Sequence, residues 1–262
     1  MKPTISPFKK TRFSFILALA AAPLFVFHLQ SFHPQNFHSL SFYSLSFHSL
    51  TLPGALATQT GTKAQPQPAR KTSQPYKGDL SIFENKDRDQ KLQVQRVMDI
   101  LHIQPGANVA DIGAGSGWFS VRAAKRAAPG GTVYAEDINP DSITYINNRV
   151  HRENIPNVKT ILGSEDDPKL PESTIDAVLI MKTYHEIARP VLLLQNLKKS
   201  LRDGARIGII DKNGNGENHG IARDVVIQEM SRAGYSLLEQ HDFVKADGQD
   251  YFLIFGPDKN HK

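Results

Sequence analysis

Residues 109–119 read Val109-Ala110-Asp111-Ile112-Gly113-Ala114-Gly115-Ser116-Gly117-Trp118-Phe119. Three alternate glycines separate an apolar run, typical of a buried strand, from a segment that can begin a helix. Because glycine has no Cβ, it adopts positive φ angles and lets a ligand approach the backbone, while amides at a helix start can hold an anion. The stretch therefore predicts a strand-to-helix turn that receives a nucleoside-like or carboxylate-bearing ligand.

Outward from this turn, short apolar runs alternate with amphipathic segments from residue 81 onward, a pattern that builds a parallel sheet covered by helices. The expected strands are 108–112, 132–137, 158–162, 175–181 and 206–211, and the expected helices are about 89–102, 117–128, 141–154, 188–201 and 220–233. Two further extended runs, 236–243 and 250–255, are too close for a helical crossover, so we expect an antiparallel hairpin. The prediction is a doubly wound, Rossmann-like α/β fold with helices on both faces.

The glycine spacing separates two families of nucleotide-binding loops. The nicotinamide and flavin fingerprint needs glycine at its first, third and sixth positions, and counting from Gly113 the sixth is Trp118. Asp111 followed by three alternate glycines resembles instead the acidic-x-Gly-x-Gly-x-Gly motif of class I S-adenosylmethionine-dependent methyltransferases. The resemblance covers residues 81 to about 255 and implies a seven-stranded, mostly parallel sheet with an antiparallel last strand.

The same resemblance implies S-adenosylmethionine as cofactor. Its methionine part is assigned to Asp111 and to the loop residues Gly113, Ala114, Gly115 and Gly117. The second strand ends in Glu136 and Asp137, where a carboxylate can accept both ribose hydroxyl hydrogens. Since successive strand side chains face opposite ways, only one of the pair is expected to meet the ribose easily; Asp137 is favoured, and Glu136 is the second candidate.

Three acids, Glu165, Asp166 and Asp167, follow the third expected strand. In the family this loop covers the adenine, and an acidic side chain commonly accepts a hydrogen from the exocyclic amine. Asp166 resembles that residue, with Glu165 or Asp167 as substitutes if the register shifts by one; a solvated turn is the structural alternative. No second oxygen-rich cluster has calcium-loop spacing, so no metal site is expected.

The fourth expected strand delivers a polar run to the edge where such sheets place ligands. Within it, His185 is the candidate to take a proton from a hydroxyl or amine, with Glu186 or Tyr184 orienting it. A polar cap at a strand-to-helix junction is the alternative reading of His185. Asp211, at the end of the fifth strand, is a weaker candidate for the same rim.

The residues at this strand end indicate which class of molecule accepts the methyl group. The Asn/Asp-Pro-Pro-aromatic motif common in methyltransferases acting on nucleic acids or proteins is absent, and the Tyr-His-Glu run is similar to members acting on small molecules. A small-molecule acceptor is therefore expected. A non-catalytic S-adenosylmethionine-binding module, or an aminopropyl transferase on a similar sheet, stays open.

The basic charge belongs to the amino-terminal part of the chain. Residues 1–80 carry eight Lys/Arg and one acid, whereas residues 81–262 carry 23 bases and 25 acids. The mildly acidic domain gives no electrostatic reason to bind a polyphosphate backbone, so no nucleic-acid partner is expected.

The first 80 residues are expected to lie outside the domain, which is assigned to residues 81–262. Basic residues precede an apolar run, so residues 1–30 are expected to be a signal peptide or a membrane anchor, with the tether at 13–29. Residues 31–80 contain a five-residue Ser/Phe/His repeat and a polar linker, expected to be disordered. This predicts a periplasmic or membrane-anchored protein. A cytoplasmic location stays open, because S-adenosylmethionine is a cytoplasmic metabolite.

Overall fold

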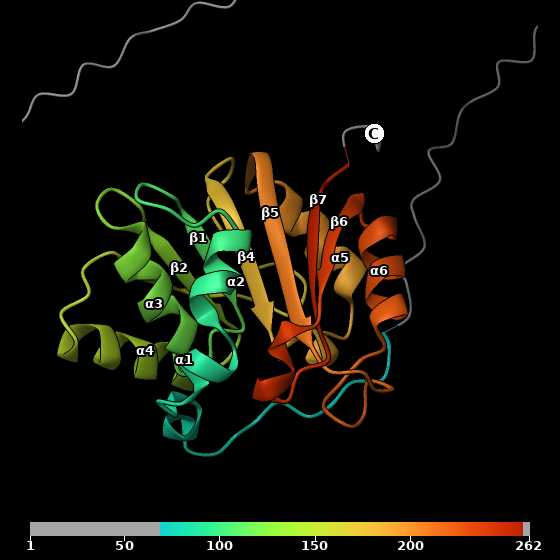
Figure 1. Ribbon diagram of the computed structural model, residues 1–262, viewed down its shortest axis with the longest axis horizontal. Coiled ribbons are helices and arrows are strands. Elements are labelled where there is room, and N and C mark those ends of the chain that lie inside the picture. Colours follow the sequence, from blue (N-terminus) through green and yellow to red (C-terminus); the bar gives the residue numbers. More distant parts are fainter. Residues whose placement is uncertain (1–68, 259–262) are drawn as a thin grey trace, which may run out of the picture. The chain divides into compact units, whose positions relative to one another are not determined.

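The computed structural model describes residues 69–258 of the chain, whose arrangement is shown in Figure 1. The leader expected at residues 1–30 and the repeat that follows it lie outside the described residues. Within 69–258, no helix is long and apolar enough to cross a membrane.

The strands of the described part form one seven-stranded sheet in the order β3-β2-β1-β4-β5-β7-β6. Their bounds are β1 Val109–Ile112, β2 Val133–Asp137, β3 Val158–Leu162, β4 Ile175–Met181, β5 Leu201–Asp211, β6 Tyr235–His241 and β7 Tyr251–Pro257. The first five strands pair in parallel, and β7 runs antiparallel to both β5 and β6. The expected fold and the terminal hairpin are confirmed, with β7 inserted between β5 and β6.

Helices cover both faces of this sheet (Figure 1). The α-helices are α1 Arg88–Lys91, α2 Val94–Ile100, α3 Trp118–Ala127, α4 Pro140–Arg152, α5 Pro190–Lys198 and α6 Arg223–Arg232, and the 3-10 helices are η1 Leu80–Glu84, η2 Tyr184–Glu186 and η3 Phe243–Asp247. Adjacent residues of β4 face opposite sides of the sheet. Val178 is buried with residues of α5 and α6, and Leu179 is buried with residues of α2 and α3. The alternation of a strand thus supplies two apolar cores.

The opening helix, expected over 89–102, is divided into α1 and α2. Gln93 lies between them with a φ of +53°, in the left-handed region that a continuous right-handed helix does not visit. Leu92 and Val94 on either side of it are both buried. The break therefore lets two short helices bury apolar side chains against the same face of the sheet.

Residues 69–79 correct the expected boundary between linker and domain, because they pack against the domain. Arg70 donates through Nη1 to Glu229 Oε2 at 2.7 Å and through Nε to the carbonyl of Ile187 at 2.9 Å. Ser73 is buried and donates to the carbonyl of Gly216 at 2.8 Å. A docked segment that binds through polar side chains carries no hydrophobic periodicity, so the sequence pattern placed it in the linker.

We expect Leu179→Ala to lower the free energy of unfolding by about 2–5 kcal/mol, because truncating a buried leucine leaves a cavity. Leu179 lies in β4 with 0% of its surface exposed. Leu238→Ala is the matched control, since this leucine is 51% exposed and its truncation should cost less than about 1 kcal/mol. Urea unfolding followed by circular dichroism measures both, and equal losses would contradict the assigned core.

Candidate functional site

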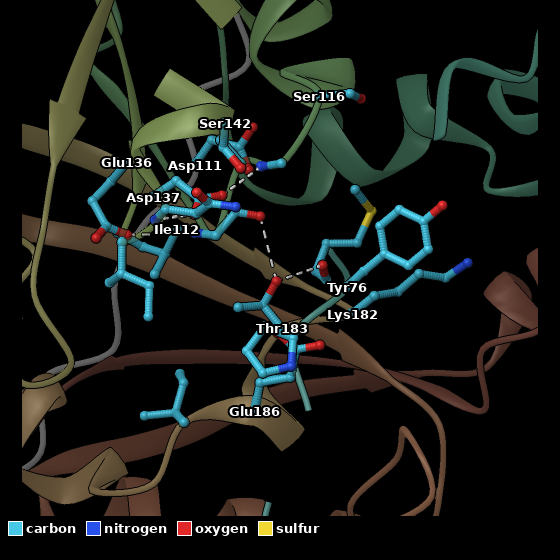
Figure 2. Close-up of a pocket in the computed structure, with 18 of the residues that line it drawn as sticks. Tyr76, Asp111, Ile112, Ser116, Glu136, Asp137, Ser142, Lys182, Thr183 and Glu186 are labelled. Atoms are coloured by element: carbon cyan, nitrogen blue, oxygen red, sulfur yellow. Dashed lines mark hydrogen bonds between the residues drawn. The ribbon is translucent and has the colours of Figure 1, made fainter. Parts of the chain in front are cut away.

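A cavity of about 380 Å³ lies at the carboxyl ends of β1, β2 and β4 (Figure 2). Doubly wound sheets bind ligands at this edge, and the volume suits a small ligand. Of the residues predicted to bind a cofactor, the lining includes Asp111, Gly113, Ala114, Gly115, Glu136 and Asp137, and leaves out Gly117 and Asp166. Residues 72–76, from the docked amino-terminal segment, also line it.

The turn after β1 takes the left-handed backbone that its glycines permit. The φ angles of Gly113, Gly115 and Gly117 are +69°, +55° and +68°. A Cβ on Gly113 would lie 2.3 Å from Thr183 Cγ2, whereas a Cβ on Gly115 would meet nothing within 4 Å. Gly117 precedes α3, and a Cβ there would lie 3.2 Å from Ile146. Gly117 therefore has a role in helix packing, and its predicted contact with the ligand stays a prediction.

Both acids at the end of β2 face the cavity and accept hydrogen bonds from the turn. Gly115 N donates to Asp137 Oδ2 at 2.9 Å, and Gly113 N lies 3.4 Å from Glu136 Oε2 (Figure 2). The prediction that only one of the pair easily reaches the ligand is therefore wrong. Gly163 gives the reason, because a Cβ there would lie 1.8 Å from Glu136 Oε1. Its missing side chain leaves room for the glutamate to bend toward the turn.

Asp111 lies buried at the end of β1 and accepts a hydrogen bond from Ser120 Oγ at 2.6 Å. Burial raises the pKa of Asp111 to about 6, and the charge of Asp137 adds to the rise. Arg88 lines the same cavity, with its guanidinium 4.5 Å from the ring centroid of Trp118. A carboxylate and a guanidinium in one cavity can hold the ammonium and carboxylate groups of an amino-acid-like ligand.

At the acidic end of the cavity, some buried hydrogen-bond acceptors have no partner among the described residues. Burial and the charge of Asp137 raise the pKa of Glu136 to about 8. Glu136 Oε1 and Ser116 Oγ are buried and have no hydrogen-bond partner among the described residues. Since ionised carboxylates so close together repel one another, this end fits a ligand that brings positive charge and hydroxyl donors. The residues present thus fit a sulfonium nucleoside.

A basic pair forms another part of the wall. Arg88 Nε and Lys182 Nζ lie 3.4 and 3.3 Å from the same oxygen, Oδ2 of Asp247. Burial lowers the pKa of Lys182, and the neighbouring Arg88 lowers it further. Two cations that share one carboxylate leave positive charge for an anionic group of a ligand. Arg88 was not among the predicted site residues, because a single arginine at the start of a helix carries no distinguishing sequence pattern.

The acidic loop after β3 places a different carboxylate at the cavity from the one predicted. Asp166 Oδ2 pairs with Arg189 at 2.5 Å and is not part of the lining, whereas Glu165 is. Ser164 N donates to the carbonyl of Asp167, which closes a tight turn and points neighbouring side chains in different directions. Glu165, which also lies 3.7 Å from Arg189, is one of the two substitutes that the sequence left open, and its adenine role stays a prediction.

His185 is buried behind the cavity wall, with 3% of its surface exposed, and is not a lining residue. Its Nδ1 lies 2.9 Å from both carboxylate oxygens of Asp211, so Asp211 orients the ring. Of the expected partners, Tyr184 donates to Glu229 instead, whereas Glu186 Oε1 lies 3.8 Å from Nε2 of His185 and also lines the cavity. Since a carboxylate only accepts hydrogen bonds, Nδ1 is the ring nitrogen that donates to Asp211, and Nε2 faces away from this carboxylate.

Comparisons with known proteins agree with this geometry. A family model described as "Methyltransferase domain" matches residues 103–241, more than half of the chain. Protein-L-isoaspartate O-methyltransferase of Pyrococcus horikoshii is 30% identical over 102 residues, covering 39% of this chain and 44% of the relative. Nocamycin O-methyltransferase of Saccharothrix syringae is 27% identical over 115 residues, covering 44% and 41%. The chain thus spans less than half the length of these curated relatives.

The solved structures include a similar fold over most of the described residues. A SAM dependent methyltransferase from Aquifex aeolicus superposes with a TM-score of 0.62 at 22% identity, covering 68% of this chain and 98% of that chain. At this identity the likeness concerns the fold, which agrees with the seven-stranded sheet.

We expect Glu136 to make the free energy of unfolding depend on pH. Its folded pKa of about 8 exceeds the ordinary value of 4.5, so folding favours the protonated form. This stabilisation is complete below the unfolded pKa and is lost as pH rises through the folded pKa. Glu136→Gln removes the titration, so from about pH 5 to about pH 8.5 the variant should lose less stability than the wild type, by a few kcal/mol.

Calorimetric unfolding of both proteins across this range measures the difference. Glu172→Gln is the control, because Glu172 is an exposed glutamate outside the cavity and should leave the pH profile unchanged. Parallel pH profiles for the wild type and Glu136→Gln would show that no buried, protonated Glu136 exists in the folded domain.

Proposed function

The chain belongs to the family of methyltransferase domains, and from this we propose that it transfers a methyl group from S-adenosylmethionine to a small-molecule acceptor. S-adenosylmethionine is the cofactor. The observation that carries the proposal is one cavity that joins a bare glycine turn to the acids Asp111, Glu136 and Asp137. The cofactor brings a sulfonium, an ammonium group and two ribose hydroxyls to this end, where buried acceptors lack partners.

The proposed roles follow the position of each side chain. Asp111 holds the methionine part, which the bare glycine turn allows to approach closely, and Arg88 pairs with its carboxylate. Asp137 accepts from the ribose, and Glu136 adds a second acceptor through Oε1. Glu165 takes the adenine role that the sequence gave to Asp166, because Glu165 lines the cavity and Asp166 pairs with Arg189.

When bound, the cofactor supplies a methyl group on a positively charged sulfur, which departs as a neutral thioether when an acceptor lone pair attacks the carbon. Because this leaving group is already activated, positioning can supply much of the rate. Residues 72–76 and Glu186 line the remaining wall and are proposed to hold the acceptor. His185 lies behind this wall and is proposed to position Glu186, since its Nε2 lies 3.8 Å from Glu186 Oε1.

A non-catalytic module that binds the cofactor without transferring its methyl group is the second candidate. The burial of His185 behind the cavity wall favours it, since no histidine among residues 69–258 lines the cavity. Incubating the chain with methyl-labelled S-adenosylmethionine and cell extract, lipid fractions included, separates the two. Labelled small molecules support transfer, and binding without any labelled product supports the module.

We expect the full-length chain to bind S-adenosylmethionine in isothermal titration calorimetry and Asp137→Asn to bind at least about 10-fold more weakly, because a charge-assisted hydrogen bond is worth roughly 1.5–3 kcal/mol. Asp224→Asn is the matched control, since the Asp224 side chain is 79% exposed and lies outside the cavity. An unchanged affinity for Asp137→Asn would remove the ribose assignment. No binding by the wild type would remove the proposed function.

Residues 1–30 are proposed to export the chain or to anchor it through 13–29, on the support of basic residues that precede an apolar run. Cell fractionation should then recover the protein from the periplasm or the membrane. Mass spectrometry of its amino terminus should show a cleaved leader in the first case and an intact one in the second. Intact chain confined to the soluble cytoplasm would contradict the proposal.

A further inference from the structure

Three side chains able to bind a metal ion meet where β4 and β5 end. One ligand atom from each of His185, Glu186 and His219 lies within 4.8 Å of those from the other two. His185 and Glu186 belong to η2, directly after β4, and His219 lies in the loop between β5 and α6. Since β4 and β5 are parallel neighbours, their carboxyl ends bring these two loops together.

His185 is oriented as metal-binding histidines are. Such a histidine commonly donates its second ring N–H to a carboxylate, which fixes the tautomer and makes the ligating nitrogen more basic. Asp211 is that carboxylate, because it lies 2.9 Å from Nδ1 and has no exposed surface. The remaining nitrogen, Nε2, lies 3.8 Å from Glu186 Oε1.

His219 is held in place by its backbone. Its φ is +55°, in a left-handed region that is unfavourable for a non-glycine residue and that recurs at functional sites. Its N–H donates to Ser73 Oγ at 2.7 Å, and Ser73 donates in turn to the carbonyl of Gly216. The ring lies perpendicular to that of His185, with the centroids 5.7 Å apart. The loop thus presents this exposed histidine toward the buried one.

From this geometry we propose that His185, Glu186 and His219 bind a zinc ion beside the cofactor cavity. Ligand atoms at zinc-bond lengths in a tetrahedron lie about 3.4 Å apart, so the three side chains have to close by roughly 1 Å. Glu186 and His219 have the freedom for this, because neither is fully buried. Two imidazoles and one carboxylate suit zinc better than magnesium or calcium, which prefer oxygen ligands throughout.

The site adjoins the acceptor side of the cavity. Glu186 lines the cavity, and so does Ser73, which holds the backbone of His219. Three protein ligands leave the fourth position of a tetrahedral zinc ion open, as in catalytic zinc sites. There the ion would polarise an acceptor hydroxyl and lower its pKa. This role rests on the proposed function and indicates an oxygen acceptor, whereas the binding of zinc does not depend on methyl transfer.

No metal site was predicted from the sequence, because no oxygen-rich cluster in it has the spacing of a calcium loop. His219 stands in a polar loop, apart from the His185-Glu186 pair, and only the pairing of β4 with β5 brings them together. Metal ligands that lie this far apart in the sequence form no local pattern.

The test measures zinc binding directly. Full-length chain is stripped with a chelator and titrated with Zn²⁺ by calorimetry, and metal content after gel filtration is measured by mass spectrometry. We expect one zinc ion per chain and a loss of affinity of at least about 100-fold in His219→Ala, since even changes to residues that only orient a ligand cost roughly 10–100-fold. His151→Ala, which removes an exposed histidine of α4, should bind zinc as the wild type does.

Asp211→Asn provides a second variant, with an expected loss of roughly 10–100-fold because it stops holding the His185 tautomer. S-adenosylmethionine binding by His219→Ala should be unchanged, which shows that the variant is folded. No zinc bound by the wild type, or equal zinc affinity in His219→Ala, would overturn the proposed site. Zinc binding by a chain that does not bind S-adenosylmethionine would retain the site and remove the proposed function.

Discussion

The cavity depends on the way the turn after β1 presents its amides to the end of β2. Ile112 and Glu136 are register partners in the parallel pair β1–β2, so the turn begins directly beside the two acids. Positive φ angles at Gly113 and Gly115 then aim their N–H groups at Glu136 and Asp137. A side chain at Gly113 would collide with Thr183 of the neighbouring strand end, so glycine is required there for space as well as for conformation.

This arrangement concentrates acidic groups whose ionised forms the protein leaves largely without cationic partners. Asp111 and Glu136 both have raised pKa values, in each case first through burial and then through neighbouring acids. A cationic ligand relieves the repulsion and favours the ionised carboxylates. Because such a ligand binds the folded state and not the unfolded one, cofactor binding and domain stability are coupled. The charges of the acidic end are therefore expected to be balanced only when a cationic ligand is bound.

The sequence predicted what local patterns encode and missed what depends on distant contacts. Strand alternation and spacing were sufficient for the sheet and for the terminal hairpin, because both follow from nearby residues. Alternation failed at Glu136, where the side chain bends into the space beside Gly163. Arg70 and His219 have their partners far along the chain, at Glu229 and Ser73, and no periodicity reports such pairs. Glu165, and not Asp166, lines the cavity because these acids lie on a tight turn. A run of adjacent acids in the sequence does not specify which of their side chains such a turn directs toward the cavity.

The two ends of the cavity differ in how they are built. The cofactor end comes from strand ends and a glycine turn inside residues 103–241, the part that the family model matches. The acceptor end adds residues 72–76, which lie outside that match and are docked by Arg70 onto the loop after β4. In a protein family, the rigid strand ends commonly carry the binding residues that all members share, while loops and terminal segments carry the residues that differ between members. If the proposed function holds, the segment that the sequence placed in a linker, together with the loops it contacts, is therefore where acceptor selectivity is expected to arise.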